Sequence, residues 1–341
     1  MTKIGILGGT RFIGFHLVKA ALQKGWSVSI FNRGITKPPE KLPKEVEQFH
    51  GNRNNGRGLK NFFKNDYDAV IDLSGHTPAH VKPIVELFRK KIGHYIFCST
   101  SYVYQTPPPV PIDENSPRTF APGTYGGDKA LAEELIFDIA KKENWPVTVF
   151  RLQGVFGEYD AGAQASYVFR RLKNNLPVIL MTKGDILFNP LYVSDLVDAF
   201  VKAANNEISY GKVYTIAGDD AVYMIDFVKR CKKIVGTELR TKIVMESSYL
   251  GTKIGVPWPD YSLVLNNNAV KNDLGINFTP LDDALSQTWK WLCENPKYLR
   301  PIVEREEKYV LQNKPISNFR RKLWRIGDKI KRPFSFLMRR F

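Results

Sequence analysis

The sequence predicts an α/β protein with a doubly wound parallel sheet and a smaller α/β lobe towards its C-terminal end. Three observations predict this fold class. Short β-branched runs alternate with amphipathic runs over the first 155 residues, a glycine-rich turn follows the first run, and the alternation loosens after residue 155. Such alternation is typical of βαβ units, whose strands pair in parallel. A chain of 341 residues is long enough to bury the core that this fold requires.

Six short apolar runs are the candidate strands, and amphipathic stretches separate them. The runs cover residues 3–7, 26–31, 46–50, 69–73, 95–99 and 147–152. The first amphipathic stretch, residues 12–24, stops at Gly25, as helices often do. Residues 105–123 hold six prolines and are predicted to form an extended surface segment over the mouth of the sheet.

The stretch GGTRFIG, residues 8–14, lies between the first predicted strand and the first predicted helix. Glycines in such a turn adopt positive φ and let the backbone approach phosphate oxygens, while the helix N-terminus favours negative charge. The setting indicates a Rossmann-type dinucleotide site in preference to a tight turn without a ligand. The expected cofactor contacts in this loop are Gly8, Thr10, Arg11, Phe12, Ile13 and Gly14.

The second predicted strand leads into Asn32 and Arg33, where NAD-preferring proteins carry an acidic residue that holds the ribose 2′-hydroxyl. No carboxylate repels a 2′-phosphate at this position, and the guanidinium of Arg33 offers planar donors to it. Arg11 lies on the same side, at the start of the first helix. The sequence therefore predicts NADP as the cofactor, with NAD as the alternative if both arginines are only solvated surface residues.

With this cofactor site, the chain divides into three predicted parts. Residues 1–155 are the NAD(P)-binding Rossmann domain, which roughly 186–215 completes. Residues 156–300 are mainly the substrate-binding lobe, and residues 301–341 are a basic amphipathic C-terminal tail.

Tyr125 and Lys129 form a candidate catalytic pair with the spacing Y-x-x-x-K. Residues four apart share one face of a helix, and an ammonium beside a phenol stabilises the phenolate and lowers its pKa. Such a phenolate takes a proton from a substrate hydroxyl while a hydride leaves the same carbon. Gly126 and Gly127 cost helix stability, which predicts that this backbone lies near a ligand.

A hydroxyl cluster, Ser99, Thr100 and Ser101, follows the fifth predicted strand. Ligands of open α/β sheets lie beyond the carboxyl ends of the strands, so these hydroxyl groups are placed to bond a substrate oxygen. Taken alone, the cluster is equally consistent with a simple turn at the end of a strand.

These features, in this order, resemble the extended short-chain dehydrogenase/reductases. Among them the chain resembles the NAD(P)-dependent epimerase/dehydratase family that modifies nucleotide sugars. The order is a glycine loop, a Ser/Thr cluster before Val103 and Tyr104, and Tyr-Gly-x-x-Lys followed four residues later by Glu133. The likeness covers roughly residues 1–295 and includes DLSG at 72–75, RLQGVFG at 151–157 and NPLYVSDLVDAF at 189–200.

The resemblance implies roles for individual residues. Tyr125 would be the acid/base, Lys129 would bind the nicotinamide ribose and tune Tyr125, and Thr100 would orient the substrate. The resemblance also implies contacts to the cofactor ribose and to the substrate. The cofactor ribose would be bordered by Leu73, Ser74 and Gly75, and the substrate would lie near Ser101 and Tyr192.

The expected activity is hydride transfer at a hydroxyl or keto group of a nucleotide-linked sugar, as an oxidoreductase or epimerase. Dehydration is not expected, because the 4,6-dehydratases of the family have an Asp-Glu pair where this chain has Ser101 and Tyr102. GGTRFIG, FNRG and GNR also resemble an atypical branch that includes the chloroplast stem-loop-binding proteins, some of which bind RNA. The alternatives are therefore an RNA-binding protein with vestigial catalysis and a cofactor-sensing scaffold, although Tyr125 and Lys129 favour retained chemistry.

The chain carries 50 Lys and Arg against 34 Asp and Glu, and half of this excess lies at its end. Residues 319–341 contain nine Lys or Arg and one acid, with apolar residues at spacings of three and four. The pattern is typical of a helix in a membrane interface, and equally of a helix packed on the body or on a second subunit. Nucleic acid is not the expected partner, because the charge is concentrated in a tail. The sequence is also compatible with a homodimer.

Several other residues indicate structure more than chemistry. His76 and His80 are four apart, but Pro78 and the lack of a third ligand argue against a metal, so helix-cap or cofactor-contact roles are preferred. Asp195 is predicted to be a helix N-cap and Cys98 a core residue. Three widely spaced cysteines predict neither a disulfide framework nor a zinc site. No apolar run could span a bilayer, so the expected location is the cytoplasm.

Overall fold

The computed structural model describes residues 1–55, 57–160, 162, 164–244, 257–259 and 261–300. Seven strands make up its central sheet: β1 (Lys3–Leu7), β2 (Ser27–Asn32), β3 (Glu47–His50), β4 (Tyr67–Asp72), β5 (Ile92–Thr100), β6 (Val147–Leu152) and β11 (Lys212–Ile216). The strand order is β11-β6-β5-β4-β1-β2-β3, and every neighbouring pair is parallel. The doubly wound parallel sheet predicted from the sequence is therefore confirmed.

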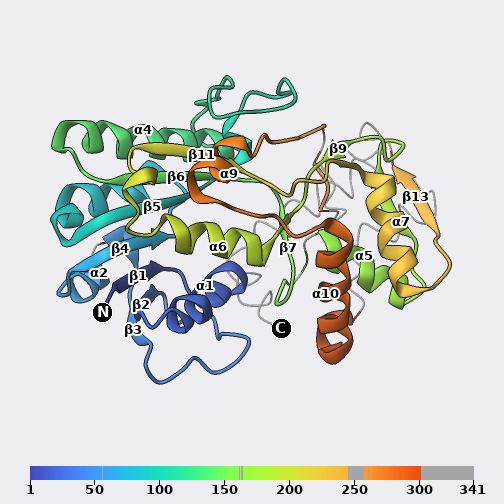
Figure 1. Cartoon of the computed structure of the whole chain (residues 1–341), viewed down its shortest axis with the longest axis horizontal. Helices are drawn as coiled ribbons and strands as arrows, with labels where there is room; N and C mark the ends of the chain where they lie inside the picture. Colours follow the sequence, from blue (N-terminus) through green and yellow to red (C-terminus); the bar gives the residue numbers. More distant parts are fainter. Residues whose placement is uncertain (56, 161, 163, 245–256, 260, 301–341) are drawn as a thin grey trace, which may run out of the picture.

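The strand order reverses between β1 and β4. The chain lays down β1, β2 and β3 outward, and then crosses back to place β4 on the other side of β1 (Figure 1). Ligands of open α/β sheets lie at the carboxyl ends of the strands beside such a reversal. The loops after β1, β2, β4 and β5 are therefore the ones that position a site.

Helices cover both faces of this sheet. They are α1 (Phe12–Gln23), α2 (Arg57–Phe62), α3 (Pro78–Pro83), α4 (Tyr125–Glu143) and α6 (Val193–Ala203). Helices α1 and α6 pack together on one face, and α2, α3 and α4 lie on the other (Figure 1). Because successive strand residues point to opposite faces, Ile4 and Ile6 join the core under α1, whereas Val70 and Phe97 join the core under α4.

A second lobe lies at one end of the sheet (Figure 1). Its helices are α5 (Gln164–Lys173), α7 (Met224–Val235) and α10 (Leu281–Glu294), which pack on one another beside the parallel pair β8 (Val178–Met181) and β13 (Thr241–Val244). The remaining short elements are β7 (Val155–Phe156), β9 (Leu187–Phe188), β10 (Leu191–Tyr192), β12 (Val222–Tyr223) and α9 (Asn268–Leu274). After its first pass through this lobe, the chain returns to the sheet as β11 and pairs with β6.

The basic tail, residues 301–341, lies outside the described residues, so its contact with a membrane, the body or a second subunit stays a prediction. Across the part of the chain that the structure describes, no helix has the length and apolar character needed to cross a membrane.

Asp195 is not the N-cap of α6, as the sequence predicted. Strand β10 runs directly into the helix, so Tyr192 takes the cap position and Asp195 falls in the first turn. The buried Asp195 carboxylate instead accepts hydrogen bonds from the Thr279 N–H at 3.0 Å and the Thr279 hydroxyl at 2.7 Å. Asp195 therefore ties α6 to the segment before α10. Cys98 is buried, which confirms the prediction for that residue.

Strand β5 begins at Ile92, before the predicted start at residue 95, because both ring nitrogens of the polar residue His94 have hydrogen-bond partners inside the protein. The Asn205 N–H donates to His94 Nδ1 at 3.2 Å, and His94 Nε2 donates to the Thr148 hydroxyl at 2.8 Å. Both nitrogens are therefore used by the neutral ring. Burial lowers the pKa of His94 to about 4 from an ordinary value of 6.5.

This histidine predicts acid sensitivity of the fold. Between pH 6.5 and 4 the unfolded chain binds a proton at His94 that the folded chain does not, so stability falls as the pH falls. We expect His94 to remove up to about 3 kcal/mol from the free energy of unfolding near pH 4. Urea unfolding of the wild type and of His94→Gln at pH 7 and pH 4.5 measures this loss. The free energy of unfolding should fall more in the wild type than in His94→Gln. Equal losses in the two proteins would contradict the assignment.

Candidate functional site

The glycine loop forms a tight turn between β1 and α1. Gly8 and Gly9 have φ of 131° and 86°, a region that favours glycine. A Cβ atom on Gly14 would lie 2.6 Å from the Gly9 backbone nitrogen, so only glycine lets the helix approach the loop this closely. Arg11 caps α1 without a side-chain hydrogen bond, and no acidic residue lies in the first turn. The Gly14 N–H donates to the Arg11 carbonyl, whereas the Phe12 and Ile13 N–H groups have no hydrogen-bond partner among the described residues, which fits a bound pyrophosphate.

The predicted cofactor residues gather along one edge of the sheet, because the strands that precede them are neighbours. In the loop after β1, Arg11 is exposed, Phe12 and Ile13 are half-buried, and Thr10 is buried. Arg33 is exposed at the end of β2. Contact of these side chains with a cofactor stays a prediction.

Asn32 lies at the carboxyl end of β2 and has a fixed amide orientation. Its Oδ1 accepts hydrogen bonds from the Gly34 N–H at 2.6 Å and from His50 Nδ1 at 3.1 Å. Because the Gly34 N–H can only donate, the amide oxygen must face it. The Nδ2 group is buried and has no hydrogen-bond partner among the described residues. The end of β2 therefore carries an amide with an unpaired donor where an NAD-preferring protein carries a carboxylate.

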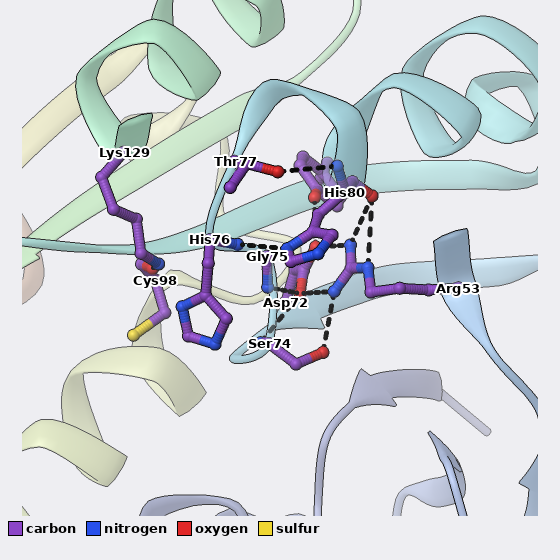
Figure 2. A network of polar contacts seen from close by, with 10 residues as sticks. Arg53, Asp72, Ser74, Gly75, His76, Thr77, His80, Cys98 and Lys129 are labelled. Atoms are coloured by element: carbon purple, nitrogen blue, oxygen red, sulfur yellow. Dashed lines mark hydrogen bonds and ion pairs between the residues drawn. The ribbon is translucent and has the colours of Figure 1, made fainter. Parts of the chain in front are cut away.

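A buried ion pair that sequence analysis missed anchors the loop after β4 (Figure 2). Arg53 Nη1 and Nη2 donate to the two carboxylate oxygens of Asp72 at 2.8 and 2.6 Å. The other N–H groups of Arg53 donate to the Ser74 hydroxyl at 2.7 Å and twice to the His80 carbonyl, so all five are used. Burial opposes ionisation of Asp72, but the charge of Arg53 prevails and holds the pKa of Asp72 well below its usual range.

The same carboxylate organises the three residues that are predicted to border the cofactor ribose. The backbone N–H groups of Ser74 and Gly75 donate to Asp72 Oδ1 at 3.0 and 2.9 Å. The Leu73 N–H donates to the Leu7 carbonyl at 3.0 Å, which keeps the start of the loop beside β1. Residues 73–75 therefore lie at the strand-order reversal, in a conformation set by protein contacts.

Tyr125 and Thr100 meet where β5 ends and α4 begins. Helix α4 starts at Tyr125, directly after Thr124, whose hydroxyl accepts a hydrogen bond from the Gly127 N–H at 3.1 Å. Tyr125 is 53% exposed, and the Thr100 hydroxyl lies near enough to its phenol to act on the phenol pKa. The protein atoms around the phenol oxygen, followed by the negative charge of an ionised Cys98, raise the pKa of Tyr125 to about 12, and the Thr100 hydroxyl offsets this only in part.

Lys129 lies one helical turn after Tyr125 but is buried, with 2% exposure. Its Nζ donates to the Cys98 carbonyl at 2.5 Å and lies 4.6 Å from the centre of the Phe97 ring (Figure 2). Burial lowers the pKa of Lys129. The expected lowering of the phenol pKa is not seen in this structure, because the ammonium is directed to the Cys98 carbonyl and not to the phenol oxygen.

Gly126 and Gly127 pack closely against the chain's own backbone. A Cβ atom on Gly126 would lie 1.8 Å from the Tyr102 carbonyl oxygen, and one on Gly127 would lie 2.0 Å from the Ala121 carbonyl oxygen. Close packing on the chain's own backbone therefore requires glycine at both positions, and the approach of a ligand to this backbone stays a prediction. Ser101 is buried, and its hydroxyl has no hydrogen-bond partner within the described ranges, so its substrate contact stays a prediction.

A second buried charge cluster lies behind the tyrosine. The Glu133 carboxylate accepts hydrogen bonds from Arg151 Nη2 at 2.7 Å, from Arg118 Nη1 at 3.2 Å and from the Ser99 hydroxyl. These partners come from β6, from the proline-rich segment and from β5. The resemblance drew attention to Glu133 but not to its partners. The cluster holds α4 against the end of β5, and so keeps Tyr125 beside the hydroxyl residues.

Tyr192 lies inside the protein. It is 4% exposed, its hydroxyl donates to Glu158 Oε1 at 2.7 Å, and its ring centre is 5.7 Å from that of Phe156. Its approach to a substrate stays a prediction. His76 and His80 do not share a helix face, because α3 begins at Pro78. Across the described ranges, no group of three or more His, Cys, Asp or Glu side chains could hold a metal ion.

Comparison with known proteins agrees with this geometry. The NAD dependent epimerase/dehydratase family matches residues 4–217. The chain is 28% identical over 246 residues to the chloroplast stem-loop binding protein of 41 kDa b of Arabidopsis thaliana, covering 69% of this chain and 63% of that protein. It is 21% identical to UDP-arabinose 4-epimerase 1 of the same plant, with 85% and 79% covered.

Among solved structures, the chain is similar to UDP-glucose 4-epimerase from Bifidobacterium longum in complex with NAD+ and UDP. The TM-score is 0.71 at 20% identity, with 87% of this chain and 100% of that chain covered. This likeness shows a shared fold. The family match extends from β1 through β11 and so includes every strand end that carries a candidate residue. The chain therefore belongs to the NAD dependent epimerase/dehydratase family.

Proposed function

We propose that this protein is an NAD(P)-dependent epimerase or oxidoreductase acting on a hydroxyl or keto group of a nucleotide-linked sugar. The observation that carries the proposal is the placement of Tyr125 near Thr100 at the carboxyl edge of the sheet, with the buried Lys129 one helical turn after the tyrosine. Membership of the family supports the cofactor. The similar proteins named as epimerases of UDP-arabinose and UDP-glucose support the substrate class.

In the proposed reaction, Tyr125 exchanges one proton with the oxygen of the reacting carbon, and Thr100 orients that oxygen. A nicotinamide cofactor, held by the glycine loop and the end of β2, would supply or accept the hydride at the same carbon. A phenol with a pKa of about 12 is protonated at neutral pH, so Tyr125 in this state is ready to protonate a ketone. To act as a base it needs a positive charge nearby, and the Lys129 ammonium is one turn away on the same helix.

We propose redox or epimerisation in preference to dehydration. Loss of a hydroxyl group requires an acid for the leaving oxygen and a base for the neighbouring carbon. The two positions after Thr100 hold Ser101 and Tyr102, and neither has a carboxyl group. An epimerase needs only the proton and hydride exchanges described above, with the ketone turned between them.

The proposed function is tested by incubating the purified protein with UDP-arabinose, UDP-glucose and dTDP-glucose, each with NAD or NADP. Products are separated by chromatography, and the configuration at each sugar carbon is read from proton NMR. We expect one of these sugars to be converted to its epimer or to a keto sugar. No conversion and no cofactor binding, together with RNA binding that falls steeply with salt, would instead favour the RNA-binding alternative.

We propose NADP as the cofactor, because Asn32 places an amide and no carboxylate at the end of β2, and two arginines, Arg11 and Arg33, lie at neighbouring strand ends. We predict that the wild type binds NADPH more tightly than NADH. Asn32→Asp replaces the donor with a carboxylate that repels the 2′-phosphate. It should therefore weaken NADPH binding by about tenfold or more and affect NADH much less. Fluorescence titration of both cofactors measures the two dissociation constants.

The control is Lys229→Ala, which removes an exposed cation paired with Asp226 on α7. It should leave both dissociation constants unchanged, since it removes positive charge away from the ends of β1 and β2. A clear preference of the wild type for NADH would overturn the NADP proposal and leave NAD as the cofactor. The proposed reaction would be unaffected, because the phosphate takes no part in hydride transfer.

A further inference from the structure

His76 lies in the loop between β4 and α3, beside the proposed catalytic tyrosine. The ring centroids of His76 and Tyr125 are 6.3 Å apart, with 47° between the ring planes. Figure 2 shows the His76 ring on the side of Cys98 and Lys129, away from the Arg53–Asp72 ion pair. The side chain is exposed, and neither ring nitrogen has a hydrogen-bond partner in the part of the chain that the structure describes.

Protein contacts alone hold the backbone that carries this ring. The His76 N–H donates to His80 Nδ1 at 3.1 Å, and the His80 N–H donates to the Thr77 hydroxyl at 3.4 Å. The His80 carbonyl in turn accepts from Arg53 Nη2 at 2.9 Å, and Arg53 is paired with the buried Asp72. The loop is thus tied to a buried ion pair, and protein contacts fix the position of His76 beside Tyr125.

The ring of His76 is neutral at physiological pH. The protein atoms on its inner side and then the positive charge of Lys129 lower the pKa of His76 to about 4. His80 and Arg53 act in the same direction, while the carboxylate of Asp72 opposes them. A neutral imidazole has one donor and one acceptor, which is the pattern that a hydroxyl group also has.

We propose that His76 is a ligand-contact residue of this site, where its imidazole hydrogen-bonds a hydroxyl group of the polyol bound over Tyr125. The inference rests on the proposed function, because the proposed reaction is what brings a polyol to Tyr125. Hydroxyl groups of this kind come from two sources, the ribose of the cofactor and the sugar of the substrate. Both offer the same chemistry to the imidazole, and binding measurements separate them.

Two substitutions test whether the ring nitrogens of His76 make the proposed hydrogen bond. His76→Phe keeps an aromatic ring beside Tyr125 and removes both nitrogens, whereas His76→Gln keeps a donor and an acceptor. The matched control is Thr77→Val, which loosens the loop through the contact to His80 and leaves the imidazole intact. Each variant is compared with the wild type by fluorescence titration with NADPH and NADH, by kcat and KM for the best sugar nucleotide, and by thermal unfolding.

A contact to the cofactor ribose predicts that His76→Phe weakens NADPH binding by about tenfold, that His76→Gln restores most of it, and that Thr77→Val changes it by less than about twofold. A contact to the substrate sugar predicts an unchanged cofactor affinity and a KM for the sugar nucleotide raised by about tenfold, with a smaller effect on kcat. Either result supports the proposal.

His76→Phe that matches the wild type in cofactor affinity and KM would overturn the inference while the proposed function stands. The inference would also be overturned if Thr77→Val reproduced the losses of His76→Phe, because the loop and not the imidazole would then be responsible. A wild type that binds neither cofactor and converts no sugar nucleotide would overturn the proposed function, and this inference with it.

Discussion

Tyr125→Phe is expected to reduce kcat for the sugar nucleotide by about 10³-fold while leaving NADPH affinity within about twofold of the wild type. The substitution removes one oxygen atom, the one that exchanges a proton with the substrate. The ring itself stays, and Tyr125 is already 53% exposed, so the fold loses little packing. Steady-state kinetics give kcat, and fluorescence titration gives the cofactor affinity.

Tyr210→Phe is the matched control, because its hydroxyl contacts Asn205 at 3.3 Å, next to the segment that enters β11. It should leave kcat and cofactor affinity unchanged. A Tyr125→Phe variant with undiminished kcat would refute the acid/base assignment. A variant that lost cofactor binding instead would make Tyr125 a binding residue and not the proton donor.

Arg53→Met is expected to lower the free energy of unfolding by about 3–5 kcal/mol at pH 7, the largest effect on stability that the structure predicts. The substitution keeps most of the side-chain volume but leaves the Asp72 carboxylate charged and without its partner, at 0% exposure. The loss of the bonds to Ser74 and His80 should also release the loop after β4 and weaken cofactor binding. Urea unfolding and fluorescence titration measure the two effects.

The pH dependence identifies the cause of this loss. In the wild type, the lowered pKa of Asp72 gives stability that is present above the ordinary carboxyl pKa of about 4 and is lost as the pH falls through the lower, folded value. In Arg53→Met, burial would raise the pKa of Asp72, so acid would neutralise the stranded charge. The difference between the variant and the wild type should therefore shrink as the pH falls.

Two comparisons complete this test. Arg53→Met combined with Asp72→Asn should be more stable than Arg53→Met alone, because no charge remains buried without a partner. Lys202→Met, which breaks an exposed pair with Asp198, should cost at most about 0.5 kcal/mol. If Arg53→Met and Lys202→Met were equally stable, the ion pair would not be the anchor described above.

Much of the sheet was predictable because strands and their connecting helices are encoded by local patterns. The strand at Val147–Leu152 was predicted at its observed boundaries, since all its residues are buried, Pro146 precedes it and Gly154 follows two residues after its end. The glycine loop was also predictable, because positive φ at Gly8 and Gly9 needs no distant partner. The spacing of Tyr125 and Lys129 on one helix is likewise a local property.

The contacts that sequence analysis did not predict have one physical cause in common: each joins residues that are far apart in the chain. Arg53 and Asp72 are 19 residues apart, and only the fold brings GNR beside DLSG. Asp195 has the composition of a cap, but its hydrogen bonds go to Thr279, 84 residues later. Nothing in the neighbouring sequence of any of these residues identifies the distant group that it meets.

The sequence by itself determined the alternation of strands and helices over the first 155 residues, the glycine turn predicted to hold a pyrophosphate, and the positions of the acid/base candidates. These depend on periodicity, on glycine and on spacing within one helix. The tertiary structure decided where the charges go: Lys129 to the Cys98 carbonyl, Arg53 to Asp72, and Arg151 to Glu133. The physical reason is that a buried charge must be paired, and its partner is the group that the packing of distant segments places beside it. That packing forms only when the sheet is assembled.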